Sequence, residues 1–297
     1  MRIRRTASEF VFDCFNHVFM VFWAVIALYP LLYVLFASLS DAGRLARHRG
    51  LILYPFGIHF DAYRRAFQNP LIVSGYKNTI IVVVLGTLLN LLMTALGAYF
   101  LSRKNVLWKT PVMVMLVITM YFGGGLIPGF LVVRALGMVG SLAALIIPSA
   151  VSAFNIIVMR TAFQSIPDSL EDAAVIDGAG HISILFRVIL PISKAILAVM
   201  ALWYGVDRWN AWYSAAIYLS KKEMWPIQLV LRDVLIQNTH GKSLDQMVAD
   251  VNTAESAQIA ETIKYALIII ATVPILCIYP FFQKHFVKGV MIGSLKG

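Results

Sequence analysis

The sequence is poor in charged residues. Only 13% of its 297 residues are Asp, Glu, Lys or Arg, whereas 60% are hydrophobic. An average soluble domain carries about 25% charged residues. The hydrophobic residues gather into runs of roughly 20, the length that crosses a bilayer as a helix. Because hydrocarbon offers backbone groups no hydrogen-bond partner, such runs must be helical. The sequence therefore predicts an all-α integral membrane protein and excludes a soluble one.

Several patterns that carry chemistry are also missing. The cysteines, Cys14 and Cys277, are too few for a disulfide framework and lack metal-ligand spacing. Histidines and acids are scattered, so the sequence shows neither a metal cluster nor a paired acid and base. A glycan-cleaving enzyme would need one of these, and it is therefore not expected. No Walker-type glycine loop is present, so ATP would have to be hydrolysed by another protein. The net charge of +10 lies on no basic stripe with interleaved aromatics, and nucleic acid is not an expected partner.

Apolar runs predict six spans within a single transmembrane domain, 1–297. These runs are 17–38, 78–101, 111–136, 142–159, 192–219 and 263–282. The first is too long for a signal-peptide core and is followed by no convincing cleavage site. An even number of spans places both termini on one side. Lys and Arg divide almost evenly between the two sides, so the positive-inside rule does not choose that side.

The most patterned polar segment, residues 166–191, lies between the fourth and fifth predicted spans; we call it the docking segment. Pro167 stops the preceding helix, and Asp168 is predicted to be the N-cap of a new one, with Glu171 as its capping-box partner. Gly178 would end this helix, since glycine tolerates the left-handed conformation that a sharp stop requires.

A second short helix is predicted from about His181 to Ile189, before Pro191 opens the next span. Small residues on the first helix, Ala173 and Ala174, would permit close approach to another surface. The result is a helix–turn–helix at a membrane surface, which suits docking to a partner. An ordinary amphipathic interfacial loop is the alternative.

The docking segment also carries a spaced motif. Asp172-Ala173-Ala174 is followed by Gly178 and then by Leu190-Pro191, with the aliphatic Val188 before them. This resembles the EAA loop of bacterial ATP-driven import permeases, the cytoplasmic segment that contacts the motor ATPase. Asp172 stands where that family usually has Glu, and Val188 stands for Ile. The resemblance implies cytoplasmic termini and a set of ATPase-coupling residues: Glu171, Asp172, Ala173, Ala174, Asp177, Gly178, Leu190 and Pro191.

The fifth predicted span contains charged residues, which cost roughly 2.5–3.5 kcal/mol each in a bilayer and usually line a cavity or pair. Tyr204, Arg208 and Trp212 recur at intervals of four, a stripe suited to stacking on sugar rings. An aromatic belt near the outer leaflet is the alternative. The candidate residues for a substrate path are Arg134, Asn155, Tyr204, Asp207, Arg208, Trp209, Asn210 and Trp212.

Some of these candidates have simpler explanations. Arg134 would line the same cavity or extend to the outer surface. Asn155 would be a ligand or a hydrogen-bonding contact between helices. The run from Gly123 to Gly125, with Pro128, would be a break used in gating or a site of close helix packing.

The tail, 283–297, resembles the C-terminus of the maltose-type permease subunit that inserts between two ATPases. The matching residues are Gly289, Gly293, Lys296 and Gly297. A basic tail attracted to anionic lipid is the alternative.

Beyond these motifs, the resemblance to carbohydrate-importer permeases covers nearly the whole chain, including YFGGGLIPGFLVVRALGMVGS and RWNAWYSAAIYL. These segments look like the subgroup that imports acidic oligosaccharides, such as alginate. The resemblance implies the MetI-like permease fold of binding-protein-dependent ABC importers, in the bacterial cytoplasmic (inner) membrane. It also implies a second homologous permease, two ATPases that bind ATP and Mg, an extracytoplasmic solute-binding protein, and no cofactor on this chain.

The charge of the substrate has a second line of support. The loops predicted to lie outside are basic and would attract an acidic sugar or the binding protein; their bases are Arg44, Arg47, Arg49, Arg64, Arg65, Lys221 and Lys222. Asp207-Arg208 stands where the acidic-sugar subgroup often has an uncharged pair. The alternative function is an ion-coupled secondary sugar transporter, which would need inverted repeats and a buried carboxylate relay; only Asp207 would serve it.

Overall fold

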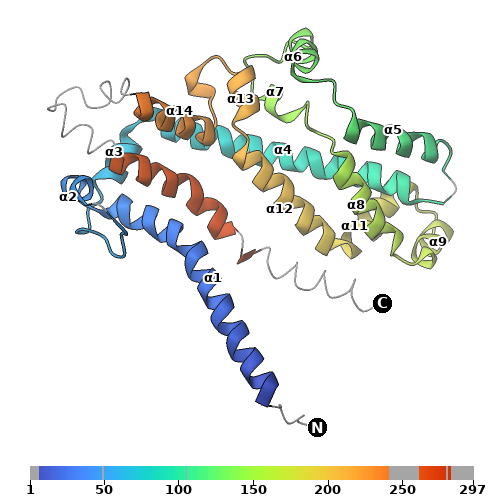
Figure 1. Ribbon diagram of the computed structural model, residues 1–297. Coiled ribbons are helices and arrows are strands. Elements are labelled where there is room, and N and C mark those ends of the chain that lie inside the picture. Colours follow the sequence, from blue (N-terminus) through green and yellow to red (C-terminus); the bar gives the residue numbers. More distant parts are fainter. Residues whose placement is uncertain (1–6, 49, 105, 241–260, 279, 282–297) are drawn as a thin grey trace. The chain divides into compact units, whose positions relative to one another are not determined.

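The computed structural model describes residues 7–48, 50–104, 106–240, 261–278 and 280–281. These residues form helices joined by turns and contain no strand (Figure 1). They fall into two compact units. Unit one holds the described residues of 7–69 and 233–272, and unit two holds those of 70–232 and 273–281.

Unit one begins with the long helix α1 (Ala7–Leu39), followed by α2 (Ala42–Arg47) and α3 (Asp61–Gln68). Its core gathers at the C-terminal end of α1, where Ala37 packs with Leu45 and Ile52. The first part of α1 keeps its large apolar side chains exposed, as a helix that faces lipid would.

Unit two is built around α4 (Pro70–Ser102), against which α8 (Ala153–Gln164) and α12 (Lys194–Asn210) pack (Figure 1). The buried side of α4 is made largely of small and polar residues, which allow helices to approach closely in a membrane. A Cβ added at its closest contacts would lie 3.1–3.3 Å from a heavy atom of α8, α12 or the start of α14 (Ile227–His240). Those positions are Gly75, Gly86 and Gly97.

The described residues account for fewer continuous spans than the six predicted. Three helices are long and apolar enough to cross a membrane, or up to five if each bent pair is one span. The three are α1, α4 and the helix Glu261–Ile278, which match the predicted spans 17–38, 78–101 and 263–282. Two bent pairs account for most of the remaining apolar sequence.

The predicted third span, 111–136, is one of these bent pairs. It comprises α5 (Lys109–Tyr121) and α6 (Leu126–Ala135), which meet at 118°. The break is at Gly123–Gly125, where Gly125 has φ +82°. No heavy atom of the described residues lies within 4 Å of a Cβ built on these glycines, so close packing among those residues does not explain them.

The predicted fourth span, 142–159, is likewise not one helix. It contains α7 (Ala143–Ile146) and the start of α8, separated by residues 147–152. Pro148 falls in this break and has no N–H with which to continue the ladder of α7. The predicted fifth span, 192–219, contains two helices: α12 ends at Asn210, and a separate helix, α13 (Tyr213–Tyr218), follows it. The short turn η2 (Lys222–Met224) comes next.

Candidate functional site

The first helix of the docking segment ends as the sequence predicts. Helix α9 (Asp168–Ile176) is followed by Gly178 at φ +81°. The Ala179 N–H donates to the Ala174 carbonyl at 2.9 Å, and the Gly178 N–H donates to that of Val175 at 2.9 Å. These two bonds form a Schellman motif, which requires a residue in the left-handed region. The sharp stop is therefore a local property of the glycine.

The start of α9 differs from the prediction. Pro167 occupies the N-cap position, and no side chain accepts a hydrogen bond from the first turn. The predicted capping box is therefore wrong. Asp168 and Glu171 instead pair with Lys104 and Arg103, which follow the end of α4. An ion pair with a neighbouring segment has displaced the local cap, since each carboxylate points toward a base.

The second half of the docking segment is a continuous helical run. It passes through α10 (His181–Ile184), a π-helical turn (Leu185–Ile189) and α11 (Leu190–Ile192). The predicted second helix is thus confirmed, but it extends beyond Pro191. At Ser193 the run meets α12 at 88°. Buried residues of this run pack on α8 and the end of α4, which fixes the segment to unit two.

The predicted coupling residues divide between two sides of the segment. Asp172, Ala173, Asp177 and Gly178 are exposed. Ala174 and Leu190 are half-buried against the core that contains Met159 and Phe163. Pro191 is exposed at the start of α11. The exposed face of α9 also carries Ile176, which is 85% exposed. A large exposed apolar side chain is available for burial against another protein.

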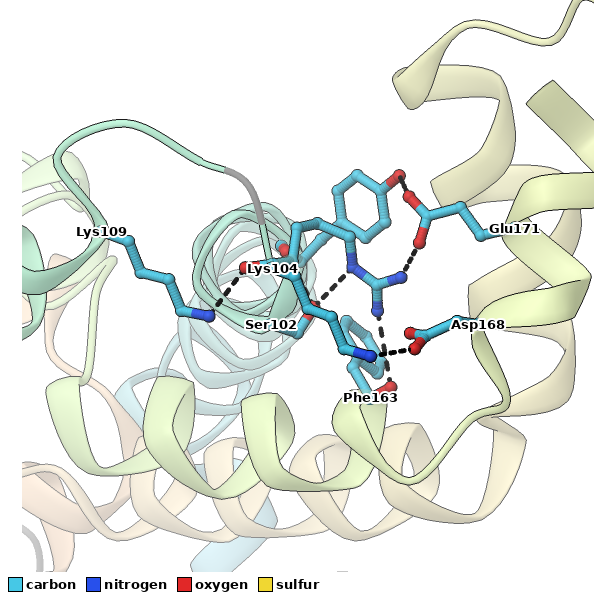
Figure 2. Close-up of polar contacts among 8 residues, drawn as sticks. Ser102, Lys104, Lys109, Phe163, Asp168 and Glu171 are labelled. Atoms are coloured by element: carbon cyan, nitrogen blue, oxygen red, sulfur yellow. Dashed lines mark hydrogen bonds and ion pairs between the residues drawn. The ribbon is translucent and has the colours of Figure 1, made fainter.

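Glu171, on the inner side of α9, faces the residues that end α4 (Figure 2). Arg103 holds the two elements together. The Arg103 guanidinium donates to one carboxylate oxygen of Glu171, and the Tyr99 hydroxyl donates to the other at 3.0 Å. A second guanidinium nitrogen lies 3.5 Å from the Phe163 carbonyl oxygen, in the last turn of α8. The Nε atom donates to Ser102 Oγ at 3.0 Å. One side chain thus joins α4, α8 and α9.

A second ion pair lies next to the first but in different surroundings. Lys104 pairs with Asp168 (Figure 2). The side chains of this pair are 76% and 55% exposed, against 13% and 16% for Arg103 and Glu171. The hydrogen bond between them raises the pKa of Lys104 and lowers the pKa of Asp168. Exposed pairs of this kind contribute little to stability, because water and salt screen them.

No pattern in the sequence connects Arg103 with Glu171, and only Glu171 was a predicted site residue. The available signal was the position of Arg103 directly after a 33-residue apolar helix. A cation at that position is stabilised by the dipole of the helix. Lys109 supports the same loop by donating to the Arg103 carbonyl at 2.7 Å.

Arg208, a candidate for the substrate path, is only 5% exposed and is surrounded by neutral oxygens. Its nitrogens donate to Asn90 Oδ1 at 2.9 and 3.2 Å and to Ser149 Oγ at 2.7 Å. They also donate to the carbonyls of Leu145, Ile146 and Ser149. We call Asn90, Leu145, Ile146 and Ser149 the Arg208 cage. Each guanidinium nitrogen is engaged, so Arg208 holds the end of α7 and the break after it.

Other candidates from α12 and the following break lie near this cage. Asp207, Asn210 and Trp212 line a cavity of about 290 Å³ with Arg208. The Trp212 ring also lies 3.3 Å below the Arg232 guanidinium. The cavity therefore combines a carboxylate, an amide and an aromatic ring, the groups with which proteins contact sugar hydroxyls and ring faces.

Two further candidates from α12 face inward. The Tyr204 hydroxyl shares a hydrogen bond of 2.6 Å with Thr94 of α4, and the Trp209 ring packs edge-on against Tyr76. Both side chains are buried, at 6% exposure. The predicted stripe of Tyr204, Arg208 and Trp212 is thus mostly turned toward the rest of unit two.

The remaining candidates are not brought together with these. Arg134 is exposed in the last turn of α6, and Asn155 is buried in the first turn of α8, where its N–H donates to Ser152 Oγ. The predicted tail residues Gly289, Gly293, Lys296 and Gly297 lie outside the described residues.

Comparison with known proteins identifies relatives along the whole chain, although no protein-family model matches it. This chain is 39% identical over 287 residues to the polygalacturonan/rhamnogalacturonan transport system permease protein YtcP of Bacillus subtilis (strain 168). The match covers 97% of this chain and 99% of that protein. Protein LplC of the same organism is 37% identical over 296 residues, covering 99% and 98%. The chain belongs to the sugar ABC transporter permease family.

A solved structure supports the same assignment for the permease. The permease is similar, with a TM-score of 0.85 and 31% identity, to a chain of a bacterial ABC transporter involved in the import of the acidic polysaccharide alginate. The match covers 96% of the permease and 99% of that chain. The predicted resemblance to carbohydrate-importer permeases is confirmed.

Family membership determines the general role of the permease. It is a membrane-embedded transport subunit of the inner membrane and not itself an enzyme. As an ABC importer permease it works with ATPase and binding-protein partners on a sugar substrate. The individual coupling and substrate residues stay predictions.

Proposed function

We propose that the permease is a six-span subunit of an importer that moves acidic oligosaccharides across the inner membrane by alternating access. Both termini would face the cytoplasm. It would pair with a second homologous permease and two ATPases, which hold ATP and Mg, while this chain binds no cofactor. A solute-binding protein would deliver the sugar from outside.

The observation that carries the coupling part is the two-sided character of α9. Its outer face, with Asp172 and Ala173, is exposed, whereas its inner face is anchored to α4 and α8. Closure of the ATPases would push on the outer face. The 88° bend at Ser193 leads directly from the docking segment into α12, so this push would reorient a membrane helix.

The acidic nature of the substrate is supported by the relatives and by charge. One relative is named for polygalacturonan, a polymer of an acidic sugar, and the solved relative is involved in the import of alginate. Unit one carries exposed bases that would attract such a substrate: Arg44, Arg47, Arg64 and Arg65. Arg208 is less suited to grip a carboxylate, because its nitrogens already bind the Arg208 cage.

Uptake into proteoliposomes that contain the assembled complex tests this function. Oligogalacturonates should be taken up only when ATP is present on the side of the membrane that carries the ATPases. Their uptake should be faster than that of neutral oligosaccharides of equal length. Equal uptake of both would contradict the acidic preference. Uptake driven by an ion gradient without ATP would support the secondary transporter instead.

A substitution at Gly178 tests the contact with the ATPase. Gly178→Val places a branched side chain at φ +81°, a strain of about 1–2 kcal/mol or more. It should weaken co-purification of the ATPases and abolish uptake. Gly180→Val is the matched control, since Gly180 has φ −74° and no atom of the described part of the chain lies within 4 Å of its Cβ position. Unchanged assembly and uptake in Gly178→Val would contradict the assignment.

A further inference from the structure

The docking segment must be connected to the membrane helices firmly enough for a push on α9 to move them. The chain itself supplies two connections, the short link from α8 at one end and the bend at Ser193 at the other. Both are single-chain junctions, and the second is sharply bent. A side-chain connection between α9 and α4 would fix the orientation of the segment, which neither junction does alone.

Glu171 provides the α9 end of such a connection. Both of its carboxylate oxygens are used within the permease, one by Arg103 and one by Tyr99. Its side chain is 16% exposed, whereas its neighbour Asp172 is exposed. The two successive acids therefore differ in orientation: Glu171 points toward α4, and Asp172 is exposed on the surface that a partner would contact.

Arg103 provides the α4 end. It follows Ser102, the last residue of α4, so a movement of its guanidinium is passed to the helix over a few bonds. Its planar head also lies 5.0 Å from the centre of the Tyr99 ring, one turn earlier in α4. An Arg side chain held by several partners at fixed angles is far stiffer than a single flexible pair.

We propose that the Arg103–Glu171 pair, with Tyr99, is the link that transmits movement of α9 to α4, and that Glu171 does not contact the ATPase. The proposal rests on the proposed role of the docking segment. The adjacent pair Lys104–Asp168 joins the same two segments but is exposed and held by a single contact. It would yield under load and is therefore the internal control.

The test compares variants of the two pairs in the assembled complex. Glu171→Gln, Arg103→Met and Tyr99→Phe remove parts of the proposed link, and Asp168→Asn with Lys104→Met removes the control pair. Co-purification of the ATPases, ATP hydrolysis and sugar uptake are measured for each. The link variants should keep the ATPases bound and hydrolysing, while sugar moved per ATP falls by about tenfold, within the range of coupling networks.

A double variant separates transmission from general damage. Because Arg103 and Glu171 act as one unit, the combined variant should transport no worse than either single one. The control pair should leave sugar moved per ATP unchanged. Tyr99→Phe removes one hydroxyl only, so it remains informative if Arg103→Met does not fold.

Several results would overturn the proposal. Loss of ATPase binding in Glu171→Gln would mean that Glu171 contacts the partner. Unchanged sugar moved per ATP in all link variants, or an equal fall in the control pair, would mean that Arg103–Glu171 is not the link. Absence of ATP-driven uptake by the unsubstituted complex would instead reject the proposed function itself.

Discussion

Two arginines in unit two, Arg103 half-buried and Arg208 buried, are satisfied in different ways. Arg103, just beyond the end of α4, is paired with the carboxylate of Glu171. Arg208, within α12, is surrounded by an amide, a hydroxyl and three backbone carbonyls of the Arg208 cage. At the edge of the apolar region a carboxylate can remain charged at little cost. Deeper inside, a second buried charge would itself have to be desolvated.

The surroundings of each arginine indicate its role. The break between α7 and α8 leaves carbonyls that no helix satisfies, and in hydrocarbon such groups need a partner within the protein. Arg208 supplies donors to this irregular backbone, so it is a structural clamp. Arg103 joins elements that are already complete helices, and its contact is one that a conformational change can use.

The largest effect is expected on removing the clamp. Arg208→Met would leave several buried acceptors without donors, each costing about 1–3 kcal/mol, so the unfolding free energy should fall by more than about 3 kcal/mol. The variant should fail to accumulate in membranes or melt much earlier in detergent. Arg134→Met, at an exposed arginine, is the control for stability and should melt as the unsubstituted protein does. Normal melting of Arg208→Met would contradict the clamp.

A smaller effect is expected on crowding the clamp without removing it. A Cβ at Gly86 would lie 3.1 Å from Arg208 Nε, so Gly86→Ala should displace the guanidinium and destabilise unit two by about 1–3 kcal/mol. Gly129→Ala is the matched control, since no atom lies within 4 Å of that Cβ position. Thermal unfolding in detergent measures both. Equal melting temperatures would show that the clamp adapts to the added methyl group.

The smallest effect is expected at the exposed pair. Because the pKa of Asp168 is lowered in the folded protein, this residue stabilises the fold above about pH 3.9, the ordinary pKa of an Asp side chain. The contribution is lost as pH falls through the folded pKa. The raised pKa of Lys104 stabilises below about pH 10.4 and is lost as pH rises through its folded pKa.

Between these limits the contribution is constant. The melting difference between the unsubstituted permease and Asp168→Asn should therefore be small, flat from about pH 5 to about pH 9, and reduced further by salt. A difference that changes around neutral pH would mean that another group titrates with this pair.

The local features of the docking segment could be predicted from the sequence. Gly178 ends α9 because a left-handed residue is needed at that position, and the second helix begins at His181 as expected. The family could be predicted as well, because the EAA-like motif combines several residues at fixed spacing. Confirmation came from relatives that match along the whole chain.

The features that failed or were missed depend on distant partners. Arg103 and Glu171 are 68 residues apart, and Arg208 and Asn90 are 118 apart. Nothing local to Asp168 indicated that its carboxylate would prefer Lys104 to the helix it begins. The break in the fourth predicted span was signalled by Pro148, but hydropathy alone reads through a single proline.

The glycines of α4 limit how this helix can change in length. Gly75, Gly86 and Gly97 follow one another at intervals of eleven residues, which is close to three full helical turns. One inserted residue would rotate everything beyond it by about 100°. The notches that admit Arg208 and Ile156 would then be replaced by bulky side chains. Insertions should therefore be tolerated in the loop that follows α4 but not inside α4 itself.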